Sequence, residues 1–244
     1  MTVVSAMGQM FYSLSIAMGI LITFGSYMKD DVSIENATEN VEIFDTGIAI
    51  LAGLMIIPAV FAFSGGDSEA INGGPSLMFN TIPQVLASIG FPRIGGILFF
   101  VLVLFAALTS AIALLESAVS TLVDETGCSR NGAAIIIGIS TLILGTLSSL
   151  GYGPLSWIQI LKMPFLDFAD FLTNSVMMPM AALAICFMVT RYIGVDAIAR
   201  EVEKQGHPFK RKGVFAFMIR YLCPIFLVII LLSSVANAFG IIKM

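Results

Sequence analysis

The chain has 244 residues, of which 58% are hydrophobic and 11% charged, and its mean hydropathy is +0.98. Soluble domains carry about 25% charged residues, so this composition predicts an integral membrane protein. The net charge of −4 says little, because the charge of such a chain is confined to loops. The lack of a basic stripe with interleaved aromatic residues argues against a nucleic-acid partner. One histidine with three irregularly spaced cysteines argues against a histidine triad or a zinc site.

Six apolar stretches are long enough to cross a bilayer, which takes about 20 residues of helix. They cover residues 5–28, 43–64, 94–116, 132–150, 168–190 and 213–239. The polar connections between them cover residues 29–42, 65–93, 117–131, 151–167 and 191–212. The sequence therefore predicts an all-α integral membrane protein with six transmembrane helices.

The first stretch contains an unusual run of small and hydroxyl residues. Ser13, Ser15, Ala17 and Gly19 alternate with bulky side chains, a pattern that favours an unwound segment over an uninterrupted helix. Unwound backbone at membrane depth is tolerated only where it lines a cavity, and its freed carbonyl groups can bind a cation there. The run therefore indicates a transport site rather than a simple anchor.

An ionisable side chain, Asp45, stands at the beginning of the second stretch. Charged groups in or near a span are costly and are functional candidates by default, so Asp45 could balance a cation. The alternative is an N-cap at the membrane surface, a position that favours aspartate, with Thr46 just inside the helix. The depth of Asp45 in the bilayer decides between the two, and the sequence leaves both open.

The connection 65–93 is too apolar for a simple solvent-exposed coil. Residues 74–86 read Gly-Pro-Ser-Leu-Met-Phe-Asn-Thr-Ile-Pro-Gln-Val-Leu, which predicts short helices lying against the external mouth as a lid. An interfacial helix without a gating role accounts for the same pattern equally well.

One face of the third stretch, at positions 106, 109, 110, 113 and 117, carries Ala, Thr, Ser, Ala and Ser. Its two adjacent hydroxyls offer hard oxygen ligands that suit sodium. Small residues also let a neighbouring helix approach closely, and on these residues alone packing is the favoured interpretation. Glu116, near the predicted cytoplasmic end, is interpreted as an interfacial charge.

Two aspartates, Asp167 and Asp170, flank the start of the fifth stretch on the predicted external side. Either could pair with an arginine across an external vestibule, although no basic residue of this chain is an obvious partner. The alternative, which the residues favour, is an aspartate stabilised by the macrodipole at the start of a helix.

Positive charge sets the expected orientation. Seven basic residues lie in and around the last connection: Arg191, Arg200, Lys204, Lys210, Arg211, Lys212 and Arg220. Cytoplasmic connections carry excess Lys and Arg, so we expect a plasma-membrane protein with loop 191–212 in the cytoplasm and loop 65–93 outside. The excess of Lys and Arg in cytoplasmic connections explains these seven basic residues, and no binding of anionic lipid needs to be assumed. Both chain ends then fall outside, which suggests the back part of a longer protein.

Four motifs in register resemble the neurotransmitter:sodium symporters, especially their prokaryotic amino-acid transporters. The resemblance runs from residue 1 to the end of the chain. The motifs are Gly8-Gln9-…-Phe11-Tyr12-Ser13-Leu14-Ser15 (sixth transmembrane segment), Leu51-Ala52-Gly53-Leu54-…-Pro58-Ala59 (seventh), Gly74-Pro75-…-Leu77-Met78-Phe79-…-Thr81-Ile82-Pro83 (external loop four) and Ala106-Ala107-Leu108-Thr109-Ser110 (eighth).

The resemblance implies a leucine-transporter-like fold of two inverted five-helix repeats followed by extra helices. Residues 1–192 would form the second repeat, segments six to ten, including the external loop 65–93. Residues 193–212 would form a basic cytoplasmic loop, and residues 213–244 would form segment eleven. The first repeat, which shares the substrate and sodium with the second, would come from residues missing here or from a separate chain.

The resemblance also implies which residues form the site. The substrate-binding positions are Tyr12, Ser13, Ser15, Met18, Ser110 and Leu114. The sodium-binding positions are Ser13, Asp45, Ala106 through its carbonyl, Thr109 and Ser110. Asp170 matches the acidic residue of the external gate, whose arginine partner belongs to the first segment. Ala17 and Met18 stand where the family often has Gly and Phe, which leaves the preferred substrate side chain open.

The implied function is sodium-coupled import of an amino acid or a related small amine by alternating access, with Na⁺ as the co-transported ion. Chloride stays open, because Asp45 could supply the negative charge that chloride supplies in animal relatives. The alternative is a truncated, non-transporting membrane subunit or gene fragment that lacks the first repeat. A channel has no visible filter sequence, and an enzyme has no nucleophile–base or metal constellation within the spans.

Overall fold

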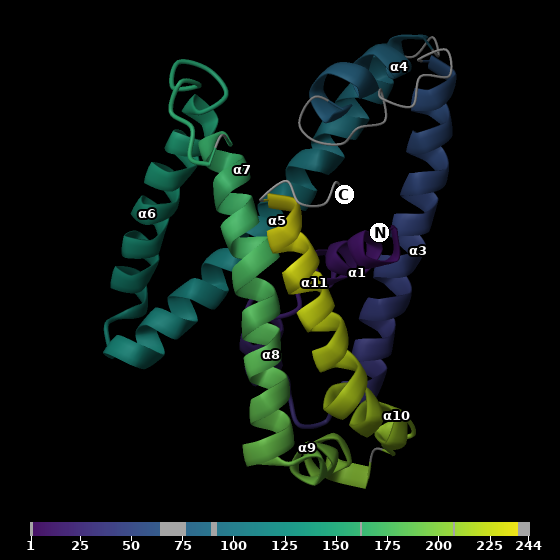
Figure 1. Cartoon of the computed structure of the whole chain (residues 1–244), viewed down its shortest axis with the longest axis vertical. Helices are drawn as coiled ribbons and strands as arrows, with labels where there is room; N and C mark the ends of the chain where they lie inside the picture. The colour runs from purple at the N-terminus through teal and green to yellow at the C-terminus, as the bar shows by residue number, and fades with distance from the viewer. Residues whose placement is uncertain (1, 64–76, 89–91, 162, 207, 239–244) are drawn as a thin grey trace. The chain divides into compact units, whose positions relative to one another are not determined.

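The computed structural model describes residues 2–63, 77–88, 92–161, 163–206 and 208–238, most of them helical (Figure 1). The helices are α1 Thr2–Ser13, α2 Ile20–Ser26, α3 Ile34–Phe63, η2 Leu77–Thr81, α4 Ile82–Ser88, α5 Pro92–Thr126, α6 Arg130–Leu150, α7 Phe165–Asp170, η3 Phe171–Met177, α8 Met178–Met188, η4 Val189–Ile193, α9 Val195–Val202, η5 Lys204–Gly206, α10 Lys212–Phe217, η6 Met218–Leu222 and α11 Cys223–Ala238.

Among the described residues, five helices are long and apolar enough to cross a membrane. They are Ile34–Ala62, Arg93–Thr126, Arg130–Leu150, Phe165–Ile193 and Lys212–Asn237. The first predicted span is present as two short helices, α1 and α2, separated by residues 14–19. The six expected spans are therefore five continuous helices and one broken helix.

Two helices are longer than their apolar stretches predict. α3 begins at Ile34 rather than at residue 43, and α5 ends at Thr126 rather than at residue 116. Hydropathy detects only the apolar part of a helix, whereas hydrogen-bonded polar turns extend the helix beyond it. A turn at Gly127, with a φ of 66°, separates α5 from α6. The connections before α3 and after α5 are shorter than predicted.

Prolines account for irregular turns in two of the spans. The π-helical turns Phe171–Met177 and Met218–Leu222 come just before Pro179 and Pro224. Proline has no N–H to donate to the carbonyl one turn earlier, so the hydrogen-bond ladder shifts at these points while the helix continues.

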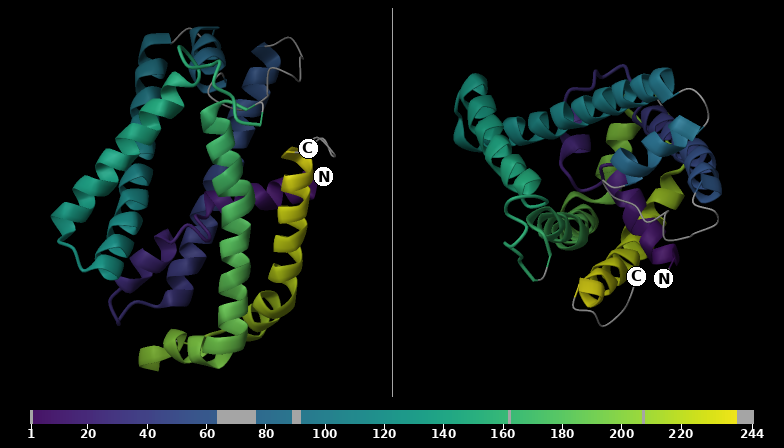
Figure 2. Two further views of the ribbon diagram at one scale, coloured as in Figure 1. Left: turned by 60° about the vertical axis from the view of Figure 1, so that its left-hand side comes forward. Right: turned by 90° about the horizontal axis from the view of Figure 1, so that it is seen from above.

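The chain divides into two compact units, one of residues 1–39 with 113–244 and one of residues 40–112. In the first unit, α8 and α11 pack side by side in opposite directions (Figures 1 and 2). Their buried core contains Ala182, Cys186 and Leu227. Two residues of the first span, Phe11 and Ala17, pack against this core, so the broken helix is anchored on the α8–α11 pair.

The second unit contains the described part of the predicted lid. η2 and α4 form a short helical segment over residues 77–88, and the ring of Phe79 stacks on Phe100 of α5 with 5.9 Å between the ring centroids. The predicted short helices are therefore present here. Residues 64–76 and 89–91 lie outside the described residues, and gating by this segment stays a prediction.

The basic connection 191–212 is structured within the first unit. The Glu35 carboxylate accepts the backbone N–H groups of Lys210 and Arg211 at 3.0 and 3.1 Å. The Arg211 guanidinium also pairs with Glu39 at 3.2 Å. The connection is thus tied to the residues that begin α3.

Candidate functional site

The backbone of the first span leaves the helical conformation between α1 and α2. Ser15, Ala17 and Gly19 have positive φ angles of 54°, 62° and 81°. Within the described part of the chain, no N–H donates to the carbonyl groups of residues 14–18. Among the described residues, the break therefore presents several backbone oxygens that accept no backbone N–H, in the middle of an apolar span. The positive φ angles confirm the expected unwinding.

One residue of the break, Gly19, suits both its positive φ angle and its close packing. Positive φ angles are strained for residues that carry a Cβ atom, and glycine alone adopts them freely. Gly19 also lies against α5, because a Cβ atom at this position would meet the Ser117 hydroxyl oxygen at 2.8 Å. Any larger residue at Gly19 would be strained by both its backbone angle and this contact.

The structure places the predicted residues in two units. Tyr12, Ser13, Ser15, Met18, Leu114 and Asp170 belong to the first unit, whereas Asp45, Ala106, Thr109 and Ser110 belong to the second. Their grouping into one substrate and sodium site stays a prediction.

Tyr12 and Ser13 are the last residues of α1, and Ser15 and Met18 lie in the break. The carbonyl of Tyr12 accepts the Ser15 N–H at 3.1 Å, which closes the last turn of α1. The Tyr12 side chain is 50% exposed. Its neighbour Phe11 packs against the α8–α11 core.

In the second unit, α5 runs without interruption through the predicted sodium residues. The Thr109 hydroxyl donates to the carbonyl oxygens of Phe105 and Ala106, both at 3.0 Å. A hydroxyl has one proton and two lone pairs. If the Thr109 hydroxyl donates its proton to the Phe105 carbonyl, the Thr109 hydroxyl oxygen and the Ala106 carbonyl oxygen each keep a lone pair with which to coordinate a cation.

Asp45 lies inside α3, eleven positions after the first residue of that helix, Ile34. The N-cap interpretation of Asp45 is therefore wrong, because an N-cap must precede the first helical turn. The interpretation of Asp45 as a functional charge within a span stays a prediction.

Both aspartates at the start of the fifth span have polar neighbours. Tyr152 donates its phenolic O–H to Asp167 at 2.8 Å, and Asn174 donates its amide N–H to Asp170. The bond to Asp167 raises the pKa of Tyr152, because the protonated phenol is the form that donates. Asp167 lies in the first turn of α7, where the macrodipole favours it.

From the sequence, Glu116 is interpreted only as an interfacial charge. In the structure, its carboxylate has two hydrogen-bonding partners. Its carboxylate accepts the Tyr27 hydroxyl at 2.7 Å and the Arg130 guanidinium at 2.7 Å. The Glu116 side chain is 20% exposed. The end of α2 is thereby joined to α5 and to the first residue of α6.

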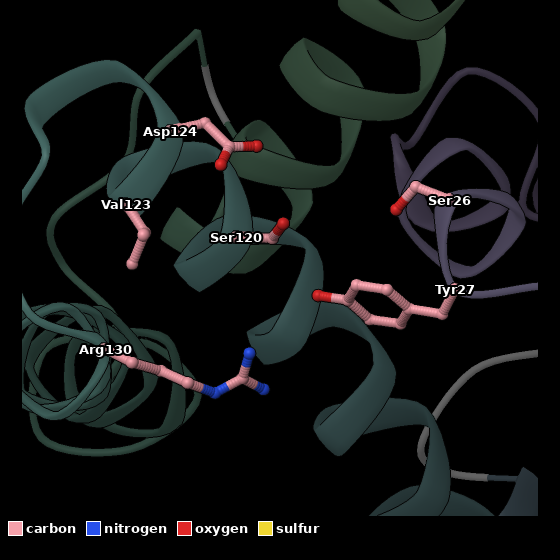
Figure 3. Close-up of a pocket in the computed structure, with 6 residues that line it drawn as sticks. All are labelled: Ser26, Tyr27, Ser120, Val123, Asp124 and Arg130. Carbon is pink, nitrogen blue, oxygen red and sulfur yellow. The ribbon is translucent and has the colours of Figure 1, made fainter.

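A pocket of about 230 Å³ lies beside this ionic cluster (Figure 3). It is lined by Ser26, Tyr27, Ser120, Val123, Asp124 and Arg130. The hydroxyl and carboxylate groups give it polar walls between α2, α5 and α6.

A second contact between α2 and α5 was not expected from the sequence. Thr23 and Ser117 are 8% and 6% exposed, and the Thr23 hydroxyl donates to the Ser117 hydroxyl at 3.4 Å. Hydroxyl residues spaced three apart, Thr23 with Ser26 and Ser117 with Ser120, are the sequence signal that could have predicted this seam.

Comparison with known proteins gives a consistent result. The sequence profile of the Sodium:neurotransmitter symporter family matches residues 2–241. An uncharacterised sodium-dependent transporter of Bacillus subtilis, YhdH, is 28% identical over 96% of this chain and 51% of its own length. A sodium-dependent transporter of Haemophilus influenzae is 28% identical over 93% of this chain and 49% of its own length.

Among solved structures, the crystal structure of MhsT in complex with L-phenylalanine resembles this chain with a TM-score of 0.84 and 35% identity. The match covers 95% of this chain and 51% of MhsT. The chain thus spans about half the length of the relatives that it matches.

Proposed function

Because the chain belongs to the sodium:neurotransmitter symporter family, we propose that it forms the second half of a sodium-coupled transporter that imports an amino acid or a related small amine. The observation that carries this proposal is the break at residues 14–19, where the carbonyl groups of residues 14–18 accept no backbone N–H from the described part of the chain. In secondary transporters, unwound helices of this kind hold the substrate and the coupled ions near the middle of the bilayer.

The proposed substrate site contains Tyr12, Ser13, Ser15 and Met18 of the broken span, with Ser110 and Leu114 of α5. The binding of L-phenylalanine by MhsT supports an amino acid as the substrate. The polar groups of the break would hold the charged ends of the amino acid. Met18, a flexible side chain, would form an adaptable wall around its side chain.

Two sodium sites are proposed from the resemblance. Ser13 and Asp45 are proposed ligands of the first sodium ion. Ala106, Thr109 and Ser110 are proposed ligands of the second, and the free lone pairs at Thr109 and Ala106 support this assignment. Asp45 could also replace chloride as the balancing negative charge.

The first repeat would be supplied by a preceding segment of the same protein or by a separate chain. The half-length match to the relatives supports this view, and it equally allows a non-transporting fragment. In the complete transporter, Asp170 would close the external gate with an arginine of the first repeat. We place the protein in the plasma membrane, with loop 191–212 in the cytoplasm and loop 65–93 outside.

A binding experiment tests the second sodium site. In the full-length protein, the double substitution Thr109→Val with Ser110→Ala should remove two hydroxyl ligands and weaken sodium-dependent amino-acid binding by roughly tenfold or more, because even the loss of an outer-shell partner of a metal ligand costs about 10–100-fold. Binding of radiolabelled amino acid is measured over a range of sodium concentrations.

The matched control is Ser140→Ala with Thr141→Val on α6. These adjacent hydroxyls also donate to carbonyls of their own helix, at 2.9 Å each, but lie outside the proposed site. The control should leave the sodium dependence unchanged. Equal sodium dependence in both double variants would remove the second-site assignment, and no sodium-dependent binding by the intact protein would favour the non-transporting alternative.

A further inference from the structure

Two cysteines lie where α8 and α11 pack together in the first unit. Cys186, on α8, is 8% exposed and belongs to the buried core of the helix pair. Cys223, on α11, is half-buried and packs against that core. Both are free thiols, and neither has a part in the proposed substrate or sodium sites.

The register of the two helices places these thiols at one level. α8 and α11 run in opposite directions (Figures 1 and 2), and Ala182 of α8 and Leu227 of α11 share the core. Cys186 follows Ala182 by four residues, and Cys223 precedes Leu227 by four residues. Cys186 therefore lies about one turn from Ala182 on the same face of α8, and Cys223 lies about one turn from Leu227 on the same face of α11. Because the two helices are antiparallel, both displacements are toward the same end of the helix pair.

Small side chains at this contact permit a short separation between the helices. Alanine and cysteine let neighbouring membrane helices approach closely, and a disulfide requires Cα atoms within about 7 Å. The two thiols also differ in access. Cys223 is the more exposed residue, whereas Cys186 is buried, so we expect a reagent from the membrane to meet Cys223 first.

We propose that Cys186 and Cys223 form a dithiol that a lipid or alkyl hydroperoxide oxidises to a disulfide, joining α8 covalently to α11. The Cys223 sulfur attacks the distal peroxide oxygen, the O–O bond breaks, and the thiol proton leaves with the alcohol. The Cys186 sulfur then attacks the resulting sulfenic acid, the S–S bond forms, and the S–O bond breaks to release water. The thiols lose two electrons and two protons in total.

The experiment uses the full-length protein in lipid vesicles treated with tert-butyl hydroperoxide. Trypsin cleavage after Lys162, Arg191, Arg220 and Lys243 gives peptides 163–191 and 221–243, which carry Cys186 and Cys223. Mass spectrometry should find these two peptides linked, with a mass lower than their sum by two hydrogen atoms. Dithiothreitol should separate them. The variant Cys128→Ser, which removes the remaining cysteine of this chain, should give the same linked peptide.

A register variant sharpens the test. Ala182→Cys combined with Cys186→Ala moves the α8 thiol by four residues, about 6 Å along the axis, and should reduce the linked peptide by roughly tenfold or more. Intact thiols after peroxide treatment, or two separately oxidised cysteines without a link, would overturn it, and so would an equally abundant link in a folded register variant.

Discussion

The first and third spans both carry neighbouring hydroxyl residues, but they present them in different ways. In the first span the helix ends at Ser13, and the carbonyl groups of residues 14–18 receive no N–H from the described part of the chain. In the third span α5 continues through Thr109, whose hydroxyl bonds to carbonyls of its own helix. The first span offers backbone oxygens of an unwound segment, whereas the third offers the Thr109 hydroxyl and the Ala106 carbonyl of an intact helix.

The break and Thr109 differ in how much the fold must support them. An unpaired carbonyl in a bilayer costs several kcal/mol, so the break needs support from its surroundings. Phe11 and Ala17 pack on the α8–α11 core, and Gly19 lies against Ser117. The Thr109 hydroxyl is already satisfied within α5 and needs no such support. Substitutions should therefore affect folding at the break and ion binding at Thr109.

The largest effect is expected for Gly19→Val. A β-branched residue would have to adopt the φ of 81° and would meet the Ser117 hydroxyl, which is itself buried. The backbone strain and the overpacking together should lower the free energy of unfolding by about 2–4 kcal/mol. The measurement is the thermal unfolding midpoint in detergent, followed by loss of the monodisperse peak in size-exclusion chromatography.

Gly25→Ala is the matched control for this substitution. Gly25 lies in α2, and a Cβ atom at this position would meet no heavy atom within 4 Å. This variant should be neutral or more stable by up to about 1 kcal/mol, because alanine favours the helix. If Gly19→Val were tolerated as well as Gly25→Ala, the break would not require glycine, and the contrast between the two spans would lose its main support.

A smaller effect is expected for Tyr27→Phe, which tests how α2 stays attached to α5. The substitution removes the 2.7 Å hydrogen bond to Glu116 and leaves the pair of Glu116 with Arg130 in place. The loss should be about 1 kcal/mol of unfolding free energy, the usual value for one hydrogen bond. The same thermal assay measures it.

Tyr221→Phe provides the comparison for this hydroxyl. Tyr221 is 56% exposed, and its ring contacts Phe217, so the ring contact is kept and only an exposed hydroxyl is lost. This variant should unfold within about 0.5 kcal/mol of the unchanged protein. Equal stability of the two tyrosine variants would mean that Glu116 does not hold the end of the broken span.

The contrast between the spans also explains which features the sequence could predict. The break was predictable because its signal is local, in the alternation of small and hydroxyl residues with bulky ones from Ser13 to Gly19. The lengths of α3 and α5 were not, because hydropathy registers the bilayer core and not the polar turns beyond it. The bond between Tyr27 and Glu116 joins residues 89 positions apart, so it depends on how α2 packs against α5, which no short motif encodes.

The smallest effect on stability is expected for Thr109→Val, and it completes the comparison. Among the described residues, its hydroxyl bonds only to the carbonyls of Phe105 and Ala106, a pattern that adds little to helix stability. The unfolding free energy should change by less than about 0.5 kcal/mol, as for Thr141→Val on α6, whose hydroxyl bonds to Ile137 in the same way. A much larger loss of unfolding free energy for Thr109→Val than for Thr141→Val would assign Thr109 to helix packing. A hydroxyl that serves only as an ion ligand, and is otherwise satisfied within its own helix, can be removed without unfolding the protein.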